Sequence, residues 1–550
     1  MKYNLMPHQI NTEEKFEQFN RRMAVCFQMG LGKTLTSLHL TVKHNKKGFI
    51  LCPKSLKFQW KNELIKWGIC KEEDVFVSTN KKDALKQLNF NKFKYVIFHY
   101  EQFRLFSIVD DMIDTIFKYK LLKKWVTREQ LYPMFNNINF YRKSKEKIEK
   151  DEKYKKSKKH ISFLDEEEEL IYENISSLNN NYNDIIFILD ETYKIKNYES
   201  QTSKAIKFLS HTLPWYGVVG LDGTIYYNNV FETCTIMNII KPNTIPQDKM
   251  MEYVYIVQRG NFKKFVFRNL EKFNKLINEK IMYRVRRDEV AQDLPSLSFQ
   301  FYYIEHSKEA QKLKDYLIKE IGNIFEIYTT LRALDSYLDL DEIVKEKISS
   351  KDYNPENESS VFSLIKDYPI RKFENIDKLN SLKDIIEEIG TEKIIIFTAY
   401  YRTAKWLKSK LDKYKIGLVY SKSENIEETT KEFLYGNIQI LITTDSLARG
   451  FNANHVNYLI HYDIHPSNAL MQQRNFRICR LDSKDPKLVI NLVSDVIEND
   501  IYEIIQKKQK NFNIVVDGNE NGGDIKTEEN DVMNEIANKL HIKINNRSKE

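Results

Sequence analysis

The sequence predicts an α/β protein with two parallel-sheet domains and helical insertions. Short, continuously apolar runs of four to seven residues recur in two series, which a long gap separates. Stretches with helical spacing of apolar residues lie between the runs. Because strands that are buried on both faces read as continuous rather than alternating apolar segments, these runs are typical of parallel strands covered by helices.

The two series of apolar runs place the domains along the chain. The first series occupies residues 48–52, 95–99, 184–189 and 216–221, and the second occupies residues 393–398, 416–421, 438–444, 457–463 and 488–493. Since each series can form one covered sheet, we expect two α/β domains. The predicted parts are a first domain over 1–295, a helical linker or protrusion over 296–375, a second domain over 376–510, and a polar, flexible tail over 511–550.

Two insertions separate strands of the first domain by far more than an ordinary connection needs. A charged insertion covers about residues 105–183, and a helical, aromatic-rich insertion covers about residues 228–285. The centre of the charged insertion, Lys143 to His160, is rich in lysine. Such a run is typical of a solvated helix or loop, and it is also suited to binding phosphates or a protein partner.

Composition bounds the environment of the protein. The 86 basic and 77 acidic residues give a formal net charge of +9, which is compatible with nucleic-acid binding but does not indicate it. The five cysteines form no C-x-x-C pair and no zinc-binding spacing, which favours a reduced, intracellular protein. The sequence has neither a signal peptide nor a run of 18 apolar residues, so we expect no membrane partner and a cytoplasmic location, in the host cell if the protein is viral.

The run CFQMGLGKT, from Cys26 to Thr34, predicts a nucleotide-binding loop. Two glycines allow the tight backbone curl that turns successive amide groups toward phosphate oxygens. Lys33 supplies a positive charge for the β- and γ-phosphates, and the Thr34 hydroxyl is suited to ligate Mg²⁺. The strict pattern has glycine where this chain has Phe27, so a chance glycine turn is the alternative. The predicted contacts of ATP in this loop are Met29, Gly30, Leu31, Gly32, Lys33 and Thr34.

Two adjacent carboxylates end the predicted strand at 184–189. In an α/β nucleotide enzyme, the carboxyl edge beside the phosphate loop is where such groups act. We expect Asp190 to hold Mg²⁺ and Glu191 to orient and deprotonate the attacking water. A turn or a helix N-cap is the alternative role for the same two residues.

The order of the motifs along the chain resembles a superfamily-two helicase motor, and within it the Swi/Snf family of DNA translocases. The motifs are MGLGKT, LCPKSLKFQW, LDETYKIKN, VVGLDGTIYYN, ITTDSLARGFN and QQRNFRICR. The resemblance covers roughly residues 5–500 apart from the insertions, and YRVRRDEVAQDLP at 283–295 adds to it. Tyr193 stands where the family usually has histidine, and Asp222 and Ile225 stand where it has threonine and proline. These departures bear on how hydrolysis is coupled to movement.

The resemblance implies two RecA-like domains and further contacts to ATP. Gln9 matches the family's adenine-reading glutamine, although a polar residue at a helix start is the alternative. Gln473, Arg477 and Arg480 match a motif whose arginines reach the γ-phosphate from the second domain, and an exposed basic helix face is the alternative. Gly450 and Asn452 match an element that couples nucleic-acid grip to the nucleotide state.

The resemblance also implies a set of residues that contact nucleic-acid phosphates. These residues follow predicted strands, and their hydroxyl, amide and cationic groups suit phosphate oxygens, which carry no sequence information. Caps and turns at strand ends use the same residue types. The predicted contacts are Lys54, Ser55, Gln59, Thr398, Thr443, Thr444 and Arg449.

The sequence as a whole therefore predicts an ATP-hydrolysing motor that uses ATP and Mg²⁺ and translocates on double-stranded DNA. Its many Lys, Asn, Ile and Tyr residues suggest an AT-rich genome, and a compact motor without a histone-reading module fits a viral, phage or bacterial source. A strand-separating DNA or RNA helicase is the alternative of the same broad class. A binding-only relative without ATPase activity is a third possibility, against which the complete set of motif residues argues.

Overall fold

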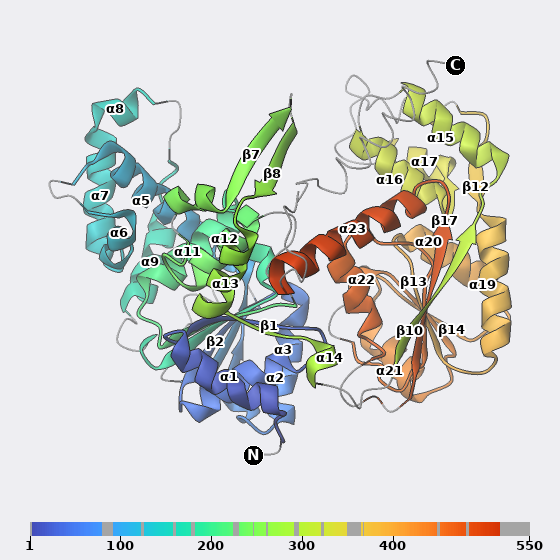
Figure 1. The fold of residues 1–550 in the computed structure, drawn as a ribbon, viewed down its shortest axis with the longest axis horizontal. Coiled ribbons are helices and arrows are strands. Elements are labelled where there is room, and N and C mark those ends of the chain that lie inside the picture. Colours follow the sequence, from blue (N-terminus) through green and yellow to red (C-terminus); the bar gives the residue numbers. More distant parts are fainter. Residues whose placement is uncertain are drawn as a thin grey trace. The chain divides into compact units, whose positions relative to one another are not determined.

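The computed structural model divides into two compact units, whose main segments are Met1–Val290 and Ala291–Asn511 and which we call the first and the second unit (Figure 1). The structure describes residues 3–517 except 80–91, 123–125, 158–160, 178–181, 224–229, 246, 260–261, 291–295, 321–323, 349–364, 367, 448–450, 480–482 and 484.

The first unit is built on a seven-stranded sheet with the strand order β3-β4-β2-β5-β6-β1-β9. All its neighbouring strands pair in parallel. The strands are β1 (Arg22–Phe27), β2 (Lys47–Cys52), β3 (Val75–Val77), β4 (Tyr95–His99), β5 (Ile185–Asp190), β6 (Gly217–Leu221) and β9 (Met282–Val285). Residues 185–189 of β5 are completely buried, as expected for a central strand with both faces covered.

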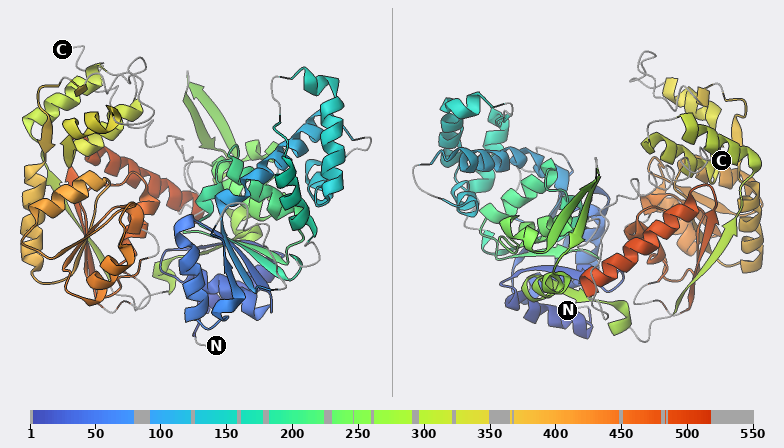
Figure 2. Two further views of the ribbon diagram at one scale, coloured as in Figure 1. Left: turned by 180° about the vertical axis from the view of Figure 1, so that it is seen from behind. Right: turned by 45° about the horizontal axis from the view of Figure 1, so that its top comes forward.

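Helices cover both faces of this sheet (Figure 2). The helices and short 3₁₀ turns around it are α1 (Pro7–Gln18), α2 (Lys33–Lys43), η1 (Lys54–Leu56), α3 (Lys57–Lys66), η2 (Glu72–Asp74), η3 (Tyr100–Phe106), η4 (Thr192–Ile195), α11 (Gln201–Thr212), α12 (Val230–Ile240), η5 (Gln247–Glu252), α13 (Leu270–Lys280) and α14 (Arg287–Val290). The carboxyl end of β1 is followed by a short loop and α2, that of β2 by η1, and that of β5 by η4. Because the strands are parallel, the predicted motif residues lie at one edge of the sheet.

The charged insertion forms a helical layer with a core of its own. It contains α5 (Ser107–Tyr119), α6 (Arg128–Met134), α7 (Ile138–Lys150), α8 (Glu152–Lys155) and α9 (Glu166–Ser177). Tyr141 of α7 and Tyr172 of α9 are completely or nearly completely buried and pack edge to face with ring centroids 5.5 Å apart. Arg142 pairs with Glu169 at 3.1 Å, so basic side chains of α7 meet acidic ones of α9. The helices are therefore amphipathic, with aromatic side chains in the core and charged side chains outside it.

The segment at about 228–285, predicted as a helical insertion, contains strands as well as helices. Besides α12 and α13, this segment contains an antiparallel hairpin of β7 (Val254–Arg259) and β8 (Phe262–Phe267), and it ends in β9 of the sheet. The hairpin is drawn as two green arrows in Figure 1. The segment is rich in β-branched and aromatic residues, which favour strands.

The second unit contains a six-stranded parallel sheet with the order β10-β17-β16-β13-β15-β14. Its strands are β10 (Leu297–Ile304), β13 (Ile394–Phe397), β14 (Ile416–Val419), β15 (Ile440–Thr443), β16 (Tyr458–His461) and β17 (Lys487–Ser494). The prediction that a helical linker begins at 296 needs correction, because β10 pairs along its whole length with β17. As an edge strand it exposes Phe299 and Tyr303, so it does not read as a continuous buried run.

Helices and a small two-stranded antiparallel sheet complete the second unit. They are α15 (Lys308–Glu320), α16 (Ile324–Leu334), β11 (Tyr337–Asp339), α17 (Leu340–Ile348), β12 (Lys372–Glu374), α19 (Ile376–Ile389), α20 (Tyr401–Lys410), α21 (Ile426–Tyr435), η7 (Asp445–Leu447), α22 (Asn468–Asn475) and α23 (Glu498–Asp517). Residues 511–517, predicted as the start of the tail, continue α23. Among the described helices, none combines the length and the apolar character that crossing a bilayer requires.

Candidate nucleotide and nucleic-acid sites

The phosphate-loop motif connects β1 to α2, and its unusual phenylalanine lies before the loop. Phe27 is the last residue of β1 and is completely buried. Its ring packs edge to face against the rings of His8 and Tyr283, with centroids 5.1 and 5.3 Å away. Since this position belongs to the strand, the loop curls at the next glycines and does not require glycine here.

Both glycines of the loop adopt the left-handed backbone region, with φ of +85° at Gly30 and +78° at Gly32. Glycine enters this region without the steric cost that a Cβ imposes. A Cβ at Gly32 would also lie 2.2 Å from Nε2 of Gln9. Gly32 is the N-cap of α2, so the loop delivers the chain to a helix N-terminus, which is suited to bind a phosphate.

Lys33 spans the loop from the first turn of α2. Its Nζ donates to the carbonyl oxygen of Phe27 at 2.9 Å. Burial lowers the pKa of Lys33, and the charges of Glu191, Asp222 and Asp190 oppose this shift. The structure thus brings the predicted phosphate-binding lysine and both predicted carboxylates together at one edge of the first sheet.

The two predicted catalytic carboxylates are held by different means. Asp190 ends β5, where its Oδ2 accepts a hydrogen bond from Nε1 of Trp60 at 2.8 Å and its carbonyl oxygen accepts one from the hydroxyl of Tyr100 at 2.7 Å. Glu191 adopts a left-handed conformation, with φ of +57° and ψ of +62°. This conformation costs a non-glycine residue about 1–2 kcal/mol, so its neighbours must fix the turn.

Asp222 is one of the groups that fix this turn, and the sequence identified it only as a departure from the family. It follows β6 and is 6% exposed. Its Oδ2 accepts hydrogen bonds from Oγ1 of Thr192 at 3.0 Å and from the backbone N–H of Tyr193 at 3.2 Å. Its Oδ1 accepts one from the N–H of Gly223 at 2.8 Å. The carboxylate therefore links the end of β6 to the residues that directly follow Glu191.

Arg284 of β9 is a second residue whose role the sequence did not predict. Its Nη1 donates to the carbonyl oxygen of Gly223 at 2.8 Å and to that of Cys26 at 3.3 Å. It therefore holds the loop after β6 against the end of β1. In the sequence, Arg284 is visible only as part of the motif at 283–295, and nothing there indicates that it contacts these two carbonyl oxygens.

Gln9, predicted to read adenine, lies against the phosphate loop and is 3% exposed. Its Oε1 accepts a hydrogen bond from the N–H of Met6 at 2.9 Å, and its Nε2 lies 3.4 Å from the carbonyl oxygen of Gly32. The neighbouring His8 donates from Nε2 to the carbonyl oxygen of Leu31 at 3.0 Å. The first turn of α1 thus contacts the phosphate loop through His8 and Gln9. Adenine recognition by Gln9 stays a prediction.

Of the three predicted phosphate contacts of the first unit, two are exposed. Lys54 and Ser55 on η1 are exposed, and Gln59 on α3 is half-buried. The next residue, Trp60, is the donor to Asp190. The segment from Lys54 to Trp60 therefore combines exposed polar side chains with a direct hydrogen bond to Asp190, the predicted Mg²⁺ ligand.

The corresponding threonines of the second unit lie deeper. The hydroxyls of Thr398 and Thr443 are completely buried, and they donate to Oδ2 of Asp463 and to the carbonyl oxygen of Thr444, respectively. Thr444 is half-buried, and its hydroxyl lies 3.3 Å from that of Ser446. Phosphate binding by Thr398 and Thr443 stays a prediction that this arrangement does not support.

The arginine motif is only partly within the described residues. Arg477 is 9% exposed and donates from Nε to the carbonyl oxygen of Gln473 at 2.9 Å and from Nη1 to that of Phe451 at 2.9 Å. Gln473 is 3% exposed, and Asn452 is exposed. The predicted residues Arg449, Gly450 and Arg480 lie outside the described residues.

Arg474 is a buried arginine of this motif that the sequence did not single out. It is completely buried, and its Nη2 and Nε lie 2.7 and 2.9 Å from Oδ1 of Asp445. Its Nη1 also lies 3.4 Å from Nδ1 of His461. The pair joins α22 to η7, that is, the arginine motif to the TTDSLARGFN motif.

Comparisons with known families identify these two units. The SNF2-related domain matches residues 20–350, and the helicase conserved C-terminal domain matches residues 377–482. Fold and motifs thus define a superfamily-two helicase-type ATPase core with two RecA-like domains. The chain belongs to the SNF2-related family, and the resemblance seen in its motifs is confirmed.

Curated relatives match parts of the chain. The uncharacterized ATP-dependent helicase YqhH of Bacillus subtilis (strain 168) is 24% identical over 346 residues, which is 60% of this chain and 59% of that protein. The ATP-dependent RNA helicase eIF4A of Saccharomyces cerevisiae (strain YJM789) is 35% identical over 108 residues, 19% of this chain and 27% of that protein. The chain therefore spans less than two thirds of the length of either relative.

Solved structures of helicase cores are also similar to this chain. The Sulfolobus solfataricus SWI2/SNF2 ATPase core in complex with dsDNA is 17% identical, with a TM-score of 0.35 and coverage of 94% of each chain. The Pyrococcus furiosus Hef helicase domain is 14% identical, with a TM-score of 0.45 and coverage of 92% of this chain and 100% of that one.

Proposed function

We propose that this protein is an ATP-dependent nucleic-acid motor that hydrolyses ATP and translocates on double-stranded DNA. The observation that carries the proposal is the convergence of Lys33, Asp190 and Glu191 around a left-handed glycine loop at a helix N-terminus. Membership of the SNF2-related family supports it. This arrangement can bind a triphosphate and activate water beside it.

The residues at this edge fit ATP with Mg²⁺. The loop Met29 to Thr34 would hold the phosphates, and the Thr34 hydroxyl and the Asp190 carboxylate would hold the metal, which neutralises charge on the phosphates. Glu191, fixed by its left-handed turn, would accept the proton of the attacking water. Gln473, Arg477 and Arg480 would act on the γ-phosphate when the second domain closes on the first, as the family resemblance implies.

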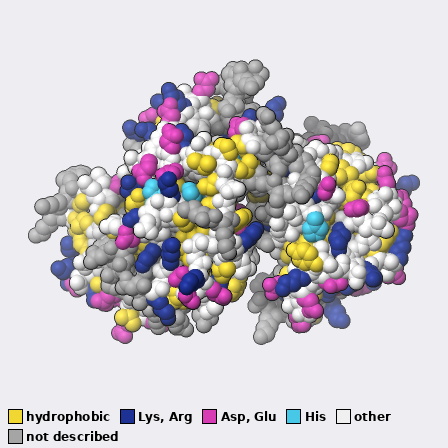
Figure 3. Space-filling model, turned by 90° about the horizontal axis from the view of Figure 1, so that it is seen from below, with side chains coloured by type: hydrophobic (Ala, Val, Ile, Leu, Met, Phe, Trp, Pro, Cys, Tyr) yellow, Lys and Arg dark blue, Asp and Glu magenta, His cyan; other side chains and the backbone are white. Residues whose placement is uncertain are grey.

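Phosphate contacts would connect hydrolysis to movement along DNA. The exposed Lys54 and Ser55 directly precede α3, whose Trp60 contacts Asp190. Contacts of this kind follow the backbone and ignore the bases. On the face drawn in Figure 3, Lys and Arg side chains are interspersed with Asp and Glu. Specific placement of cations, rather than the net charge of +9, would therefore determine binding.

A strand-separating DNA or RNA helicase is the second candidate function. The match to a relative named an ATP-dependent RNA helicase favours it, as does the β7–β8 hairpin, since a hairpin could separate two strands. The two candidates differ in substrate, since a translocase follows an intact duplex and a helicase opens one. A protein partner for the helical layer of 105–183 stays a prediction.

The test compares ATP turnover of the full chain with duplex DNA, single-stranded DNA and RNA. We expect duplex DNA to stimulate turnover at least as strongly as single strands, independently of base sequence, and RNA to stimulate poorly. The motor should displace a third strand from a duplex without unwinding a blunt duplex. A Glu191→Gln protein serves as the control for ATP-independent displacement. Stimulation by RNA alone, or ATP-dependent opening of a forked duplex, would establish the second candidate instead.

A further inference from the structure

A cavity of about 750 Å³ lies in the first unit, lined by residues of α6, α11 and α12 among others. These helices are labelled in Figure 1. Its walls are largely apolar and include Phe117, Val126, Phe231, Ile239 and Met250. None of the described residues that line it belongs to the predicted nucleotide or nucleic-acid contacts. Its volume falls within the range of about 300–1,000 Å³ that is typical of small-molecule sites.

One wall of the cavity contains buried charges with unused hydrogen-bonding capacity. Lys207 is 8% exposed, and its Nζ lies 3.8 Å from Oδ1 of the completely buried Asp110, beyond hydrogen-bond range. The same ammonium lies 5.4 and 5.1 Å from the ring centroids of Tyr132 and Tyr198. Among the described residues, Nζ of Lys207 and Oδ2 of Asp110 have no hydrogen-bond partner. Buried polar atoms in this condition are rare and call for an explanation.

His211, one turn of α11 further on, adds an acceptor. Its Nε2 donates to the carbonyl oxygen of Asn238 at 2.7 Å, so this nitrogen carries the proton. Burial holds the pKa of His211 well below its usual range, which keeps the ring neutral. Its Nδ1 is therefore a lone-pair acceptor, and it has no hydrogen-bond partner within the described part of the chain.

The charges around the cavity compensate one another. Lys204 pairs with Asp111 at 2.8 Å, and Arg128 pairs with Asp114. Lys207 and Asp110 form the third, looser pair. Because these carboxylates match the three cations and Glu129 also lines the cavity, the wall offers no excess positive charge to a phosphate or a carboxylate. It offers an ammonium donor and an imidazole acceptor beside aromatic rings.

We propose that this cavity binds a neutral, planar heteroaromatic molecule whose ring edge carries both a hydrogen-bond donor and an acceptor. The apolar and aromatic walls would bury the two faces of the ring. The edge would accept from Lys207 and donate to His211, which supplies the partners that these buried groups lack. Two such groups with an apolar surround are typical of a selective small-molecule site.

The test uses benzimidazole, which has a donor and an acceptor on its edge, and indane, a hydrocarbon of matched ring size. Binding to the full chain is measured by ligand-observed saturation-transfer NMR, with ADP and Mg²⁺ present to occupy the nucleotide site. We expect benzimidazole to bind about tenfold more tightly than indane, because its edge makes hydrogen bonds to buried polar groups. Equal binding of the two probes, or no binding of benzimidazole, would overturn the proposal.

Two variants locate the binding. Lys207→Met should weaken benzimidazole about tenfold and leave indane unchanged. Thr235→Trp, which places a large ring in the cavity, should abolish binding of both. Lys46→Met is the matched control, because it removes an ammonium paired with Asp184 elsewhere in the same unit. If Thr235→Trp does not fold by circular dichroism, Lys207→Met decides. Benzimidazole binding that survives Lys207→Met unchanged contradicts the proposal.

Discussion

The carboxyl edges of the two sheets carry the same kinds of polar residue in opposite states. In the first unit, Lys33, Asp190 and Glu191 are half-buried around a glycine loop. In the second unit, Lys378 is completely buried and donates to Oε2 of Glu498, itself 1% exposed, at 2.6 Å. One edge leaves its charged groups partly exposed, and the other buries them within the fold.

This difference in the burial of charged groups accompanies a difference in backbone conformation at the two edges. In the first unit, the left-handed glycines turn amide groups outward at the start of α2. In the second unit, the carboxylates accept the backbone amides themselves. Glu498 accepts from Ile464 N at 2.9 Å, and Asp463 accepts from Ala399 N at 2.8 Å. We infer that a common fold supports chemistry where its loops leave charged groups partly exposed, and supports stability where such groups are buried in pairs.

The largest expected effect concerns the buried pair of the second unit. Lys378→Met should lower the free energy of unfolding by about 3–5 kcal/mol, because Glu498 then remains buried without its cation. The double variant Lys378→Met with Glu498→Gln should recover most of this loss. Chemical denaturation of the full chain measures both.

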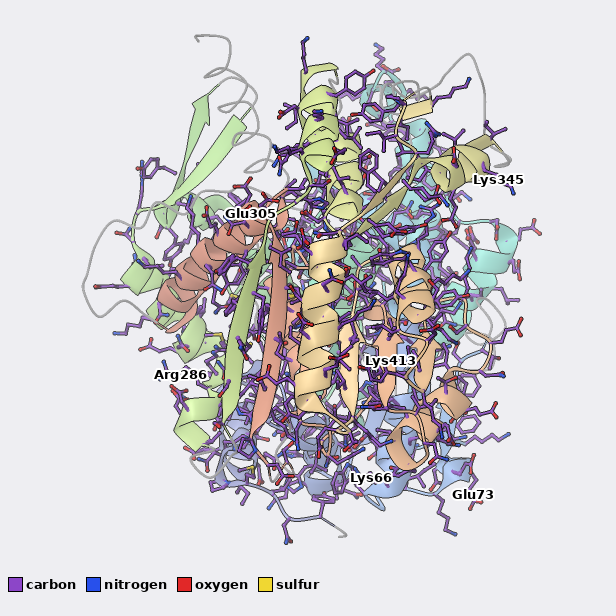
Figure 4. All side chains as sticks on the ribbon, turned by 90° about the vertical axis from the view of Figure 1, so that its right-hand side faces the viewer. Lys66, Glu73, Arg286, Glu305, Lys345 and Lys413 are labelled. Atoms are coloured by element: carbon purple, nitrogen blue, oxygen red, sulfur yellow. The ribbon has the colours of Figure 1, made fainter. Side chains whose placement is uncertain are left out.

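A surface pair provides the control for this prediction. Lys413, labelled in Figure 4, pairs with Glu387, and both side chains are more than half exposed. Lys413→Met should change the free energy of unfolding by less than about 1 kcal/mol, since exposed pairs contribute little. An equal loss of free energy of unfolding in the Lys413 and Lys378 variants would show that the buried pair contributes no more to stability than the exposed one.

The next effect concerns the open edge of the first unit. Glu191→Gln should retain ATP binding and lower turnover at least about 100-fold, because the attacking water loses its base. Lys33→Ala should abolish ATP binding. Turnover and the affinity for a fluorescent nucleotide are measured on the same preparations. Near-normal turnover of Glu191→Gln would assign the base to another residue.

A smaller effect is expected at Asp222, which acts through the turn after Glu191. Asp222→Ala should lower turnover about tenfold with unchanged ATP affinity, since Thr192 and Tyr193 lose their acceptor and the base is less well positioned. Asp222→Thr, which restores the residue usual in the family, should recover part of the rate. Loss of ATP affinity in Asp222→Ala, or no recovery by threonine, would point to a structural role only.

The smallest effect is a pH dependence in the second unit. His461 is completely buried, with its Nε2 2.7 Å from Oδ1 of Asn475, and burial with the nearby Arg474 lowers its pKa to about 3. Because the unfolded chain takes up this proton near pH 6.5, the stability contributed by neutral His461 is present above that pH and is lost as pH falls. Between pH 7.5 and 5.5 the loss should be about 1 kcal/mol.

Denaturation midpoints of the wild type and of His461→Gln check this dependence. The variant should be less stable at pH 7.5, yet its free energy of unfolding should fall less on acidification, since one fewer group takes up a proton on unfolding. The other histidines of the chain are unchanged in the comparison. An identical pH slope in the two proteins would exclude His461 as a contributor.

The motif residues themselves could be predicted from the sequence. A glycine loop, a strand that ends in two carboxylates and an ordered set of motifs are local or sequential signals, and the family match confirms the resemblance they showed. Nine strands were also predicted from continuously apolar runs, and most of them lie inside a sheet. The edge strand β10, which exposes Phe299 and Tyr303, was missed, and so was the interior strand β1, which the apolar runs did not include.

Only the tertiary structure decided which groups meet. Asp222 and Arg284 are far from Glu191 and Cys26 in the sequence. Parallel pairing of β6 with β5 brings Asp222 next to the turn at Glu191, and pairing of β9 with β1 places Arg284 beside Cys26. The tertiary structure also buries Thr398 and Arg474, whose residue types alone suggest exposed contacts. Sequence determined the chemical groups and the strands that carry them. Because hydrogen-bond partners depend on strand order and burial, the fold determined which groups stay available for a ligand and which are used to hold the protein together.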